Sequence, residues 1–361
     1  MTKEALVIGV NLGKRRGMTM APFRIAVVGC GAMSKAWIQY AKELPDGEIV
    51  ALVDLRLEQA EQAAVQYGLN AKAYTDVREA IEQSGANLVF DISIPAAHAG
   101  VTTTALQLGC DVLGEKPMAV SMEEARAVTA LAEKLGRTYA VMQNRRYLRG
   151  IRAFRDLVLH GGIGAIGFVN ADFFLGPHFG GFREAMESPL LLDMAIHTFD
   201  QARFITGKDP VAVYCHEFNP AGSWYAGNAA AVCIFEYADG GVFCYRGSWC
   251  SEGCPTSWEA SWRVSGSKGT AIWEGAADPY AEIVLPKEER SLTHAFRKVE
   301  ARMDWSGREG HAGCLDEMFA ALREGRKPET YCTDNIVSMA MVYAALESAQ
   351  KGEKVRIASL L

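Results

Sequence analysis

Between Phe23 and residue 143, short runs of consecutive apolar residues alternate with longer amphipathic stretches. Continuous apolar runs are typical of strands buried on both faces, and amphipathic stretches between them are typical of helices that cover a parallel sheet. The runs predicted to be strands are 24–29, 48–54, 88–94, 112–114 and 139–143. The pattern therefore predicts a doubly wound parallel sheet of the Rossmann type.

Two of the amphipathic stretches, 57–67 and 122–135, are predicted to be helices. The second has a recognisable start, because Ser121 and Glu124 have the spacing of a capping box, in which each side chain accepts a backbone hydrogen bond at the helix start. It also has a recognisable end, because Gly136 suits the left-handed conformation that commonly follows a last helical turn.

After Asn144 the pattern changes to aromatic and β-branched runs joined by turn-like segments at 238–241 and 265–269. Such runs predict an antiparallel or mixed sheet, and helical stretches at 310–323 and 335–349 close the chain. The predicted fold class is α/β: an N-terminal Rossmann domain, then a C-terminal α+β domain built on a mixed, largely antiparallel sheet.

Three segments are predicted from these patterns. Residues 1–22 are set apart as an N-terminal extension, in which Met18 or Met20 could be the natural start. Residues 23–143 form the dinucleotide-binding domain, and residues 144–361 form a substrate and oligomerisation domain whose last helices could pack back on the Rossmann domain.

Composition narrows the classes of function. The chain has 361 residues and a net charge of −6, which is the wrong sign for a protein that binds nucleic acid through its phosphates. No apolar run approaches the roughly 18–20 residues of a membrane span, so we expect no nucleic-acid partner, no membrane partner and a cytoplasmic location. The nine scattered cysteines are expected to be reduced, and no metal site is predicted.

A predicted strand leads into a glycine turn and then into a helix. Gly29 permits the tight turn, Gly31 allows backbone N–H groups to approach a pyrophosphate, and Ser34 replaces the third glycine of the dinucleotide-binding fingerprint. Asp54 ends the next predicted strand, where a carboxylate can accept hydrogen bonds from an adenosine ribose. It favours NAD, whereas Arg56 could pair with the extra phosphate of NADP, so NADP is a second option. The residues predicted to contact the cofactor here are Gly29, Gly31, Ala32, Met33, Asp54 and Arg56.

Three further motifs follow in order along the chain: Ile94-Pro95-Ala96-Ala97-His98, Gly114-Glu115-Lys116-Pro117 and Leu192-Asp193-Met194-Ala195-Ile196-His197. In this order, after such a nucleotide fold, they resemble the glucose-fructose oxidoreductase, inositol dehydrogenase and rhizopine catabolism (Gfo/Idh/MocA) family. The likeness extends from about Phe23 to the end of the chain. Two positions depart from the family pattern, since Ser34 occupies the third glycine position and Trp37 stands where a histidine is often found.

Oxidation of a secondary alcohol requires a base for the hydroxyl proton and a cation beside the developing oxyanion. His197 suits the base because its ordinary pKa lies near neutral pH, and Lys116 can supply the charge. Asp193 lies one turn before His197 on a helix predicted to begin with Ser188 as N-cap and to stop at Gly207. The resemblance implies that Lys116, Asp193 and His197 are the catalytic set, with Asp193 binding the substrate hydroxyl or orienting the base. On spacing alone, a surface pair at 193 and 197 and a solvated lysine are equally compatible with the sequence.

Further candidates lie at predicted strand ends, where ligands gather in doubly wound sheets. Those predicted to contact the cofactor are Ile94, Pro95, His98, Glu115 and Lys116, although His98 could instead cap a helix. Those predicted to bind the substrate are Arg146, Tyr147, Asp193 and His197. By contrast, Arg149, Arg152 and Arg155 recur at helical spacing and are expected to form a solvated face.

The resemblance implies an NAD(P)-dependent dehydrogenase that acts on a CH–OH group of a sugar, inositol or related polyol. Two alternatives stay open: an NAD-dependent glycosidase that oxidises its sugar transiently, and a non-catalytic nucleotide-sensing protein. A mixed sheet with one open face also predicts a homodimer or homotetramer.

Overall fold

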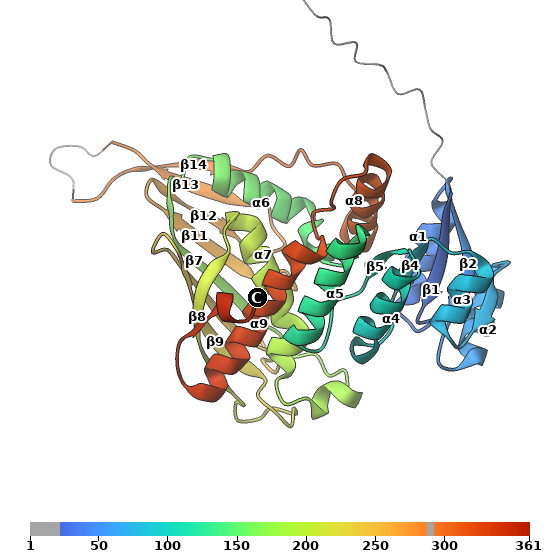
Figure 1. The fold of residues 1–361 in the computed structure, drawn as a ribbon. Coiled ribbons are helices and arrows are strands. Elements are labelled where there is room, and N and C mark those ends of the chain that lie inside the picture. Colours follow the sequence, from blue (N-terminus) through green and yellow to red (C-terminus); the bar gives the residue numbers. More distant parts are fainter. Residues whose placement is uncertain (1–21, 287–291) are drawn as a thin grey trace, which may run out of the picture.

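The computed structural model describes residues 22–286 and 292–361 (Figure 1). The N-terminal extension set apart at 1–22 therefore lies outside the described residues except for Pro22. None of the described helices is both long enough and apolar enough to cross a bilayer.

The first described domain is built on a parallel sheet of six strands in the order β3-β2-β1-β4-β5-β6. Its strands are β1 (Phe23–Val28), β2 (Gly47–Val53), β3 (Lys72–Tyr74), β4 (Leu88–Asp91), β5 (Asp111–Gly114) and β6 (Tyr139–Val141). The predicted Rossmann sheet is confirmed. Strand β3 was not predicted, because three residues with one fully buried side chain make no apolar run. The predicted strands at 88–94 and 139–143 were too long, since the chain leaves the sheet at Asp91 and Val141.

Helices cover this sheet on both faces (Figure 1). They are α1 (Ser34–Glu43), α2 (Leu57–Tyr67), α3 (Val77–Ser84), α4 (Pro95–Gln107) and α5 (Met122–Leu135). Both predicted helices, α2 and α5, are confirmed with the predicted ends. At the start of α5 the Ser121 hydroxyl accepts a hydrogen bond from the Glu124 N–H, 3.1 Å away, and Gly136 follows its end at φ +60°.

The second described domain contains a nine-stranded sheet in the order β14-β13-β12-β11-β7-β10-β9-β8-β15. Its strands are β7 (Ile166–Phe174), β8 (Pro210–Phe218), β9 (Ala230–Tyr237), β10 (Val242–Ser248), β11 (Ser261–Gly266), β12 (Gly269–Trp273), β13 (Tyr280–Val284), β14 (Phe296–Glu300) and β15 (Val355–Arg356). Among the described strands of this sheet, only β7 and β10 pair in parallel, so the predicted mixed, largely antiparallel sheet is confirmed. The predicted turns at 238–241 and 265–269 join β9 to β10 and β11 to β12.

One face of the large sheet is covered by helices, which lie between it and the Rossmann domain (Figure 1). The α-helices of this part are α6 (Arg149–His160), α7 (Ile196–Thr206), α8 (Gly310–Glu324) and α9 (Cys332–Lys351). Shorter helical turns are η1 (Asn144–Arg146), η2 (Gly181–Ala185), η3 (Leu190–Ala195) and η4 (Ile357–Ser359).

The C-terminal helices also pack on the Rossmann domain, α8 against α1 and α9 against α5. The ring of Phe319 on α8 lies 5.0 Å from that of Phe23 and 6.0 Å from that of Phe90, so α8 completes the core on one side of the parallel sheet. These contacts hold the two domains together and form the cleft between them.

Candidate active site

The glycine turn lies at the carboxyl edge of the parallel sheet, between β1 and α1. Gly29 has φ +94°, and a Cβ there would lie 2.4 Å from the carbonyl oxygen of Ile92, so only glycine fits. A Cβ on Gly31 would meet nothing within 4 Å, and no described side chain caps the first turn of α1. The turn therefore offers room and backbone N–H groups at the positive end of a helix, as a pyrophosphate requires.

Asp54 follows β2 and holds this turn in place. Its Oδ2 accepts a hydrogen bond from the N–H of Cys30, and its Oδ1 accepts one from the N–H of Arg56, both at 3.0 Å. Each carboxylate oxygen can accept further hydrogen bonds, so the same side chain can still receive ribose hydroxyls. The residues at the turn thus fit a dinucleotide.

A cavity of about 380 Å³ lies between the glycine turn and the second domain. Several residues predicted from the sequence to contact the cofactor or the substrate line this cavity: Met33, Pro95, His98, Glu115, Lys116 and Asp193. It is also lined by Phe182, Arg183, Met186 and Tyr343, which belong to none of the sequence motifs. The cavity therefore brings together residues from the ends of β4 and β5 with residues that precede α7.

Lys116 and Asp193 are in contact across this cleft. The ammonium of Lys116 donates to the carbonyl oxygen of Asp193 at 3.0 Å and to its Oδ1 at 3.4 Å. On the other side of the same carboxylate, Nε of Arg183 donates to Oδ2 at 2.7 Å. Two cations thus share one carboxylate, and Arg183 belongs to a short turn, η2, whose sequence carries no recognisable motif.

His197 lies in the first turn of α7 and is 7% exposed. Burial lowers its pKa well below the ordinary value, and the charges of Arg145, Lys116 and His311 lower it further. Its Nδ1 is buried and has no hydrogen-bond partner among the described residues. A neutral imidazole with an unfilled nitrogen is in the state that a general base requires. We refer to Lys116, Arg145, Arg183, Asp193 and His197 as the site cluster.

Glu115 lies behind Lys116 and is held from two sides. Its Oε1 accepts a hydrogen bond from Nε1 of Trp37 at 2.9 Å and lies 3.4 Å from Nε2 of His311. Burial alone would raise the pKa of Glu115, but these contacts and the Lys116 charge outweigh it and lower the pKa. The carboxylate is therefore ionised, and Trp37 orients it.

His98 is buried at the wall of the cavity. Its Nδ1 lies 3.0 Å from Oδ1 of Asp91 and 3.3 Å from the hydroxyl of Ser93, whereas its Nε2 has no partner among the described residues. It does not cap α4, whose N-cap is Ile94, with no hydrogen bond from a capping side chain. The unfilled nitrogen leaves His98 able to bind a ligand.

The segment that carries Asp193 and His197 differs from the single regular helix predicted from the sequence. It begins as the π-helical turn η3 and becomes α-helical only at Ile196. Ser188 is not the N-cap, because its hydroxyl donates to Oε2 of Glu217 at 2.9 Å instead of accepting a backbone N–H. The predicted end is confirmed, since Gly207 has φ +65°.

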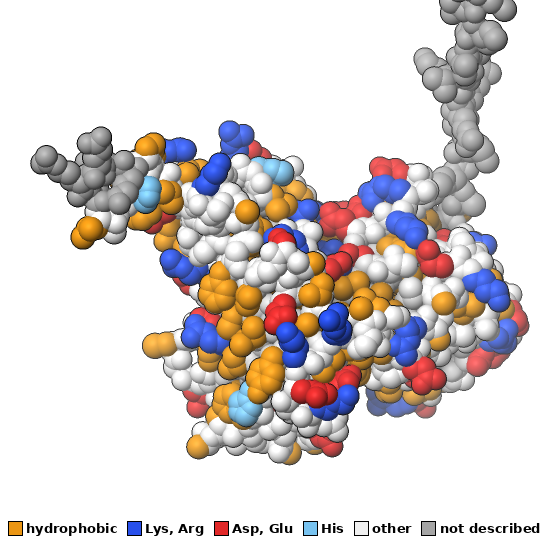
Figure 2. All heavy atoms as spheres, turned by 60° about the vertical axis from the view of Figure 1, so that its left-hand side comes forward, with side chains coloured by type: hydrophobic (Ala, Val, Ile, Leu, Met, Phe, Trp, Pro, Cys, Tyr) orange, Lys and Arg blue, Asp and Glu red, His pale blue; other side chains and the backbone are white. Residues whose placement is uncertain are grey.

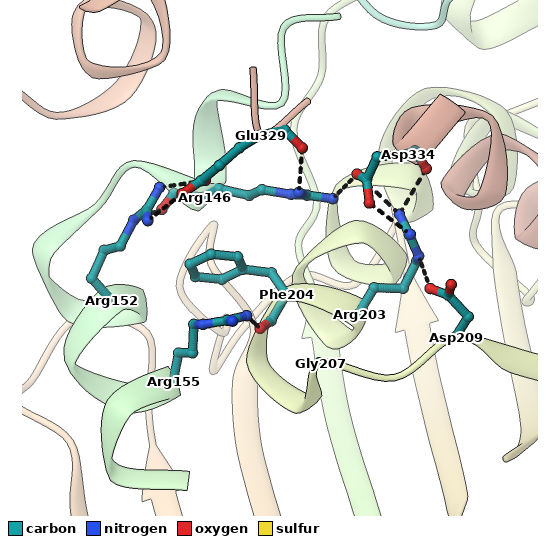
Figure 3. Close-up of a pocket in the computed structure, with 9 residues that line it drawn as sticks. All are labelled: Arg146, Arg152, Arg155, Arg203, Phe204, Gly207, Asp209, Glu329 and Asp334. Atoms are coloured by element: carbon teal, nitrogen blue, oxygen red, sulfur yellow. Dashed lines mark hydrogen bonds and ion pairs between the residues drawn. The ribbon is translucent and has the colours of Figure 1, made fainter. Parts of the chain in front are cut away.

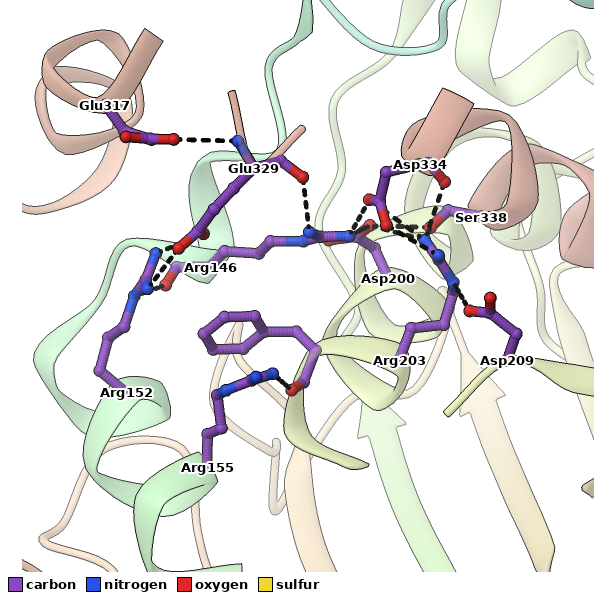
Figure 4. A network of polar contacts seen from close by, with 11 residues as sticks. Arg146, Arg152, Arg155, Asp200, Arg203, Asp209, Glu317, Glu329, Asp334 and Ser338 are labelled. Carbon is purple, nitrogen blue, oxygen red and sulfur yellow. Dashed lines mark hydrogen bonds and ion pairs between the residues drawn. The ribbon is translucent and has the colours of Figure 1, made fainter. Parts of the chain in front are cut away.

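Arg146 and Tyr147 do not line this cavity. Arg146 donates from Nε and Nη2 to the two carboxylate oxygens of Asp200, at 2.7 and 2.6 Å, and from Nη2 to Asp334 at 2.7 Å (Figure 4). Tyr147 is 2% exposed and packs under the guanidinium of Arg152, 4.7 Å from its ring centroid. The structure therefore does not support the predicted substrate-binding role of either residue at this cavity: ion pairs take up the guanidinium of Arg146, and Tyr147 is buried in the interior.

The ion pairs of Arg146 belong to a larger group, which we call the arginine network and which comprises Arg146, Asp200, Arg203, Asp334 and Ser338 (Figure 4). It borders a second cavity of about 340 Å³ (Figure 3). Arg152 and Arg155 also line this cavity, so the predicted solvated face with Arg149 is not formed. Arg152 pairs with Glu329, and Arg155 donates to the carbonyl of Phe204. The network joins η1, α7 and α9.

Comparisons with known proteins agree with this architecture. Residues 23–143 match a family described as "Oxidoreductase family, NAD-binding Rossmann fold", and residues 155–357 match its "C-terminal alpha/beta domain". Two domains of this kind, with a glycine turn and a cleft between them, define an NAD-binding oxidoreductase. The chain belongs to the Gfo/Idh/MocA oxidoreductase family.

Individual relatives have low sequence identity to this chain. D-apiose dehydrogenase from Paraburkholderia graminis is 26% identical, with 95% of this chain and 92% of that protein covered. D-glucoside 3-dehydrogenase from Escherichia coli is 32% identical over 58% of this chain and 61% of its own length. A solved oxidoreductase from Agrobacterium radiobacter, in complex with NAD+, L-tartaric acid and magnesium, shares the fold with a TM-score of 0.80 and 21% identity, over 94% of this chain and 99% of that one.

Proposed function

We propose that this oxidoreductase transfers a hydride between NAD and a hydroxyl-bearing carbon of a sugar, an inositol or a related polyol. The observation that carries the proposal is the contact between Lys116 and Asp193 at a cavity that Met33 of the glycine turn also lines. His197 follows Asp193 by four residues, and the charge of Lys116 contributes to its lowered pKa. The relatives named above, which are sugar dehydrogenases, support the same substrate class.

Each member of this set has a distinct role in the proposed reaction. NAD, when bound, accepts the hydride as the alcohol becomes a carbonyl, and one proton is released. His197, held neutral, takes the hydroxyl proton. Lys116 donates a hydrogen bond to the reacting oxygen and stabilises its developing negative charge. Asp193 fixes the ammonium of Lys116 and can accept a hydrogen bond from a substrate hydroxyl.

The residues around the glycine turn favour NAD over NADP. The Asp54 carboxylate would accept the ribose hydroxyls and would repel a phosphate at the same place. Its two backbone hydrogen bonds keep it at the end of β2. Gly29, Gly31, Ala32 and Met33 would surround the pyrophosphate, with Ile94, Pro95 and His98 on the neighbouring loop and helix. Arg56 is the residue through which NADP could still be accepted.

The test is a screen of monosaccharides, inositols and sugar acids with NAD+ and NADP+ supplied separately. We expect substrate-dependent reduction of NAD+, measured as the rise in nicotinamide absorbance. Reduction of NADP+ is expected to be weaker. Release of a leaving group without net NADH would instead identify an NAD-dependent glycosidase. Cofactor binding with neither reaction would support a nucleotide-sensing protein and contradict the proposal.

We also propose that the open face of the nine-stranded sheet binds a second copy of the chain. Neighbouring strands place Tyr214, Ile234 and Cys244 in one row across this face, and the first two are 42% exposed. Hydrophobic side chains gather between charged ones on the side of the molecule shown in Figure 2. Light scattering of the unsubstituted protein is expected to show a dimer or tetramer. The Ile234→Arg variant is expected to form a smaller species. A monomer in the unsubstituted protein would overturn this proposal.

A further inference from the structure

Arg145 is a largely buried cation with unused hydrogen-bond donors. Its side chain is 12% exposed, and the one hydrogen bond that it makes to a described residue goes to the carbonyl of Trp258. Its ion-pair partner, Oε1 of Glu259, lies 3.8 Å from Nη1, which is too long for a hydrogen bond. A guanidinium carries five N–H donors, so most of the donors of Arg145 are available to a ligand.

Glu259 only partly balances this charge. Its other oxygen, Oε2, accepts a hydrogen bond from Nε2 of Gln201 at 2.8 Å. Burial raises the pKa of Glu259, which weakens it as a counter-ion. Arg145 therefore lacks the bidentate carboxylate partner that Arg146 has in Asp200.

Arg145 lies beside the groups that would perform the chemistry. Its ion-pair partner Glu259 accepts a hydrogen bond from Gln201, which follows His197 by one helical turn on α7. Arg145 therefore lies near the part of α7 that carries His197, and its charge contributes to the lowered pKa of that imidazole. The Asp193 carboxylate is already shared by Lys116 and Arg183. An additional negative group near the reacting carbon could therefore meet the free donors of Arg145 without breaking an existing ion pair.

We propose that Arg145 binds a carboxylate of the substrate, so that the substrate is a sugar acid, either an aldonate or a uronate. The planar fork of a guanidinium matches the two oxygens of a carboxylate, and such charge-assisted pairs are among the strongest hydrogen bonds in proteins. This inference rests on the proposed function and specifies its substrate class. Arg145 is then a specificity residue that holds the acid group while Lys116 and His197 act on a hydroxyl-bearing carbon.

The experiment compares matched pairs of substrates with NAD+: D-galacturonate against D-galactose, and D-gluconate against D-sorbitol. We expect kcat/KM to be about 100-fold higher for an acid than for its neutral counterpart. Arg145→Gln should remove that preference, chiefly by raising KM for the acid. Arg145→Lys should restore part of it, because an ammonium keeps the charge but loses the fork.

Two controls separate a failed inference from a failed function. Arg149→Gln makes the same change at an exposed arginine four positions further along the chain and should leave the preference unchanged. NAD+ binding by Arg145→Gln, measured by calorimetry, should equal that of the unsubstituted protein if the fold is intact. Oxidation of neutral polyols with no preference for acids would overturn the proposed role of Arg145 but would still support the proposed dehydrogenase function. If no compound in the set reduces NAD+, the proposed function itself fails.

Discussion

Arg145 and Arg146 are adjacent in the sequence, but they belong to two differently built groups of charges. In the arginine network, Arg146 donates to the carboxylates of Asp200 and Asp334 and to the Glu329 carbonyl, so two carboxylates balance its charge (Figure 4). In the site cluster, Arg145 keeps unused donors. A buried charge that is held by several acceptors supports the fold, whereas one that keeps free donors can bind a ligand.

Removing the charge of Lys116 from the site cluster should reduce activity strongly and spare the fold. Lys116→Met preserves much of the side-chain volume but removes the hydrogen bonds to the reacting oxygen. Since loss of one oxyanion donor costs about 10²–10³ in rate, and the positive charge is lost as well, we expect kcat to fall by about 10³-fold. Steady-state kinetics gives this value, and thermal melting should be nearly unchanged. A large drop in melting temperature would show that Lys116 serves the fold instead.

The opposite result is expected in the arginine network. Asp200→Ala leaves Arg146 buried without its bidentate partner, and breaking a buried ion pair costs roughly 3–5 kcal/mol. Thermal and urea melts should show this as a marked loss of stability. As a comparison, Arg323→Gln removes a half-exposed pair with Asp46 and should change stability little. Equal effects of the two substitutions would contradict the distinction drawn here.

A smaller effect, a shift of the pH profile of activity, is expected when the charge of Arg145 is removed from the site cluster. After burial, the charge of Arg145 is the next cause of the lowered pKa of His197. Arg145→Gln should therefore raise that pKa, so that activity is lost at a higher pH as the solution is acidified. The measurement is the pH profile of kcat/KM for a neutral polyol, with Arg149→Gln as control. An unshifted acidic limb would mean that the imidazole is not the titrating base.

Much of the fold could be predicted from local patterns. The ends of α5 follow from Ser121, Glu124 and Gly136, because capping chemistry depends on residues only a few positions apart. Strand β3 and the π-helical turn η3 could not be predicted, since neither has a local pattern of its own. Ser188 was misassigned for the same reason: its hydrogen-bond partner, Glu217, lies in a distant strand.

The site was predictable where a motif marks it. Lys116 and Asp193 were singled out from separate motifs, and their side chains are in contact across the cleft. Arg183 and Arg145 were missed because an arginine in a turn carries no signal of what it will face. Arg146 was placed at the substrate for the same reason, and its partner Asp200 is 54 residues away in the sequence.

The sequence by itself determined the two-domain order, the parallel and mixed sheets, and the glycine turn with Asp54, since these depend on short-range periodicity and steric demands. Only the tertiary structure decided which of two adjacent arginines completes an ion-pair network and which keeps open donors beside His197. The reason is physical. The pairing of a buried charge depends on groups brought near it by the packing of distant elements, and no local pattern of residues specifies them.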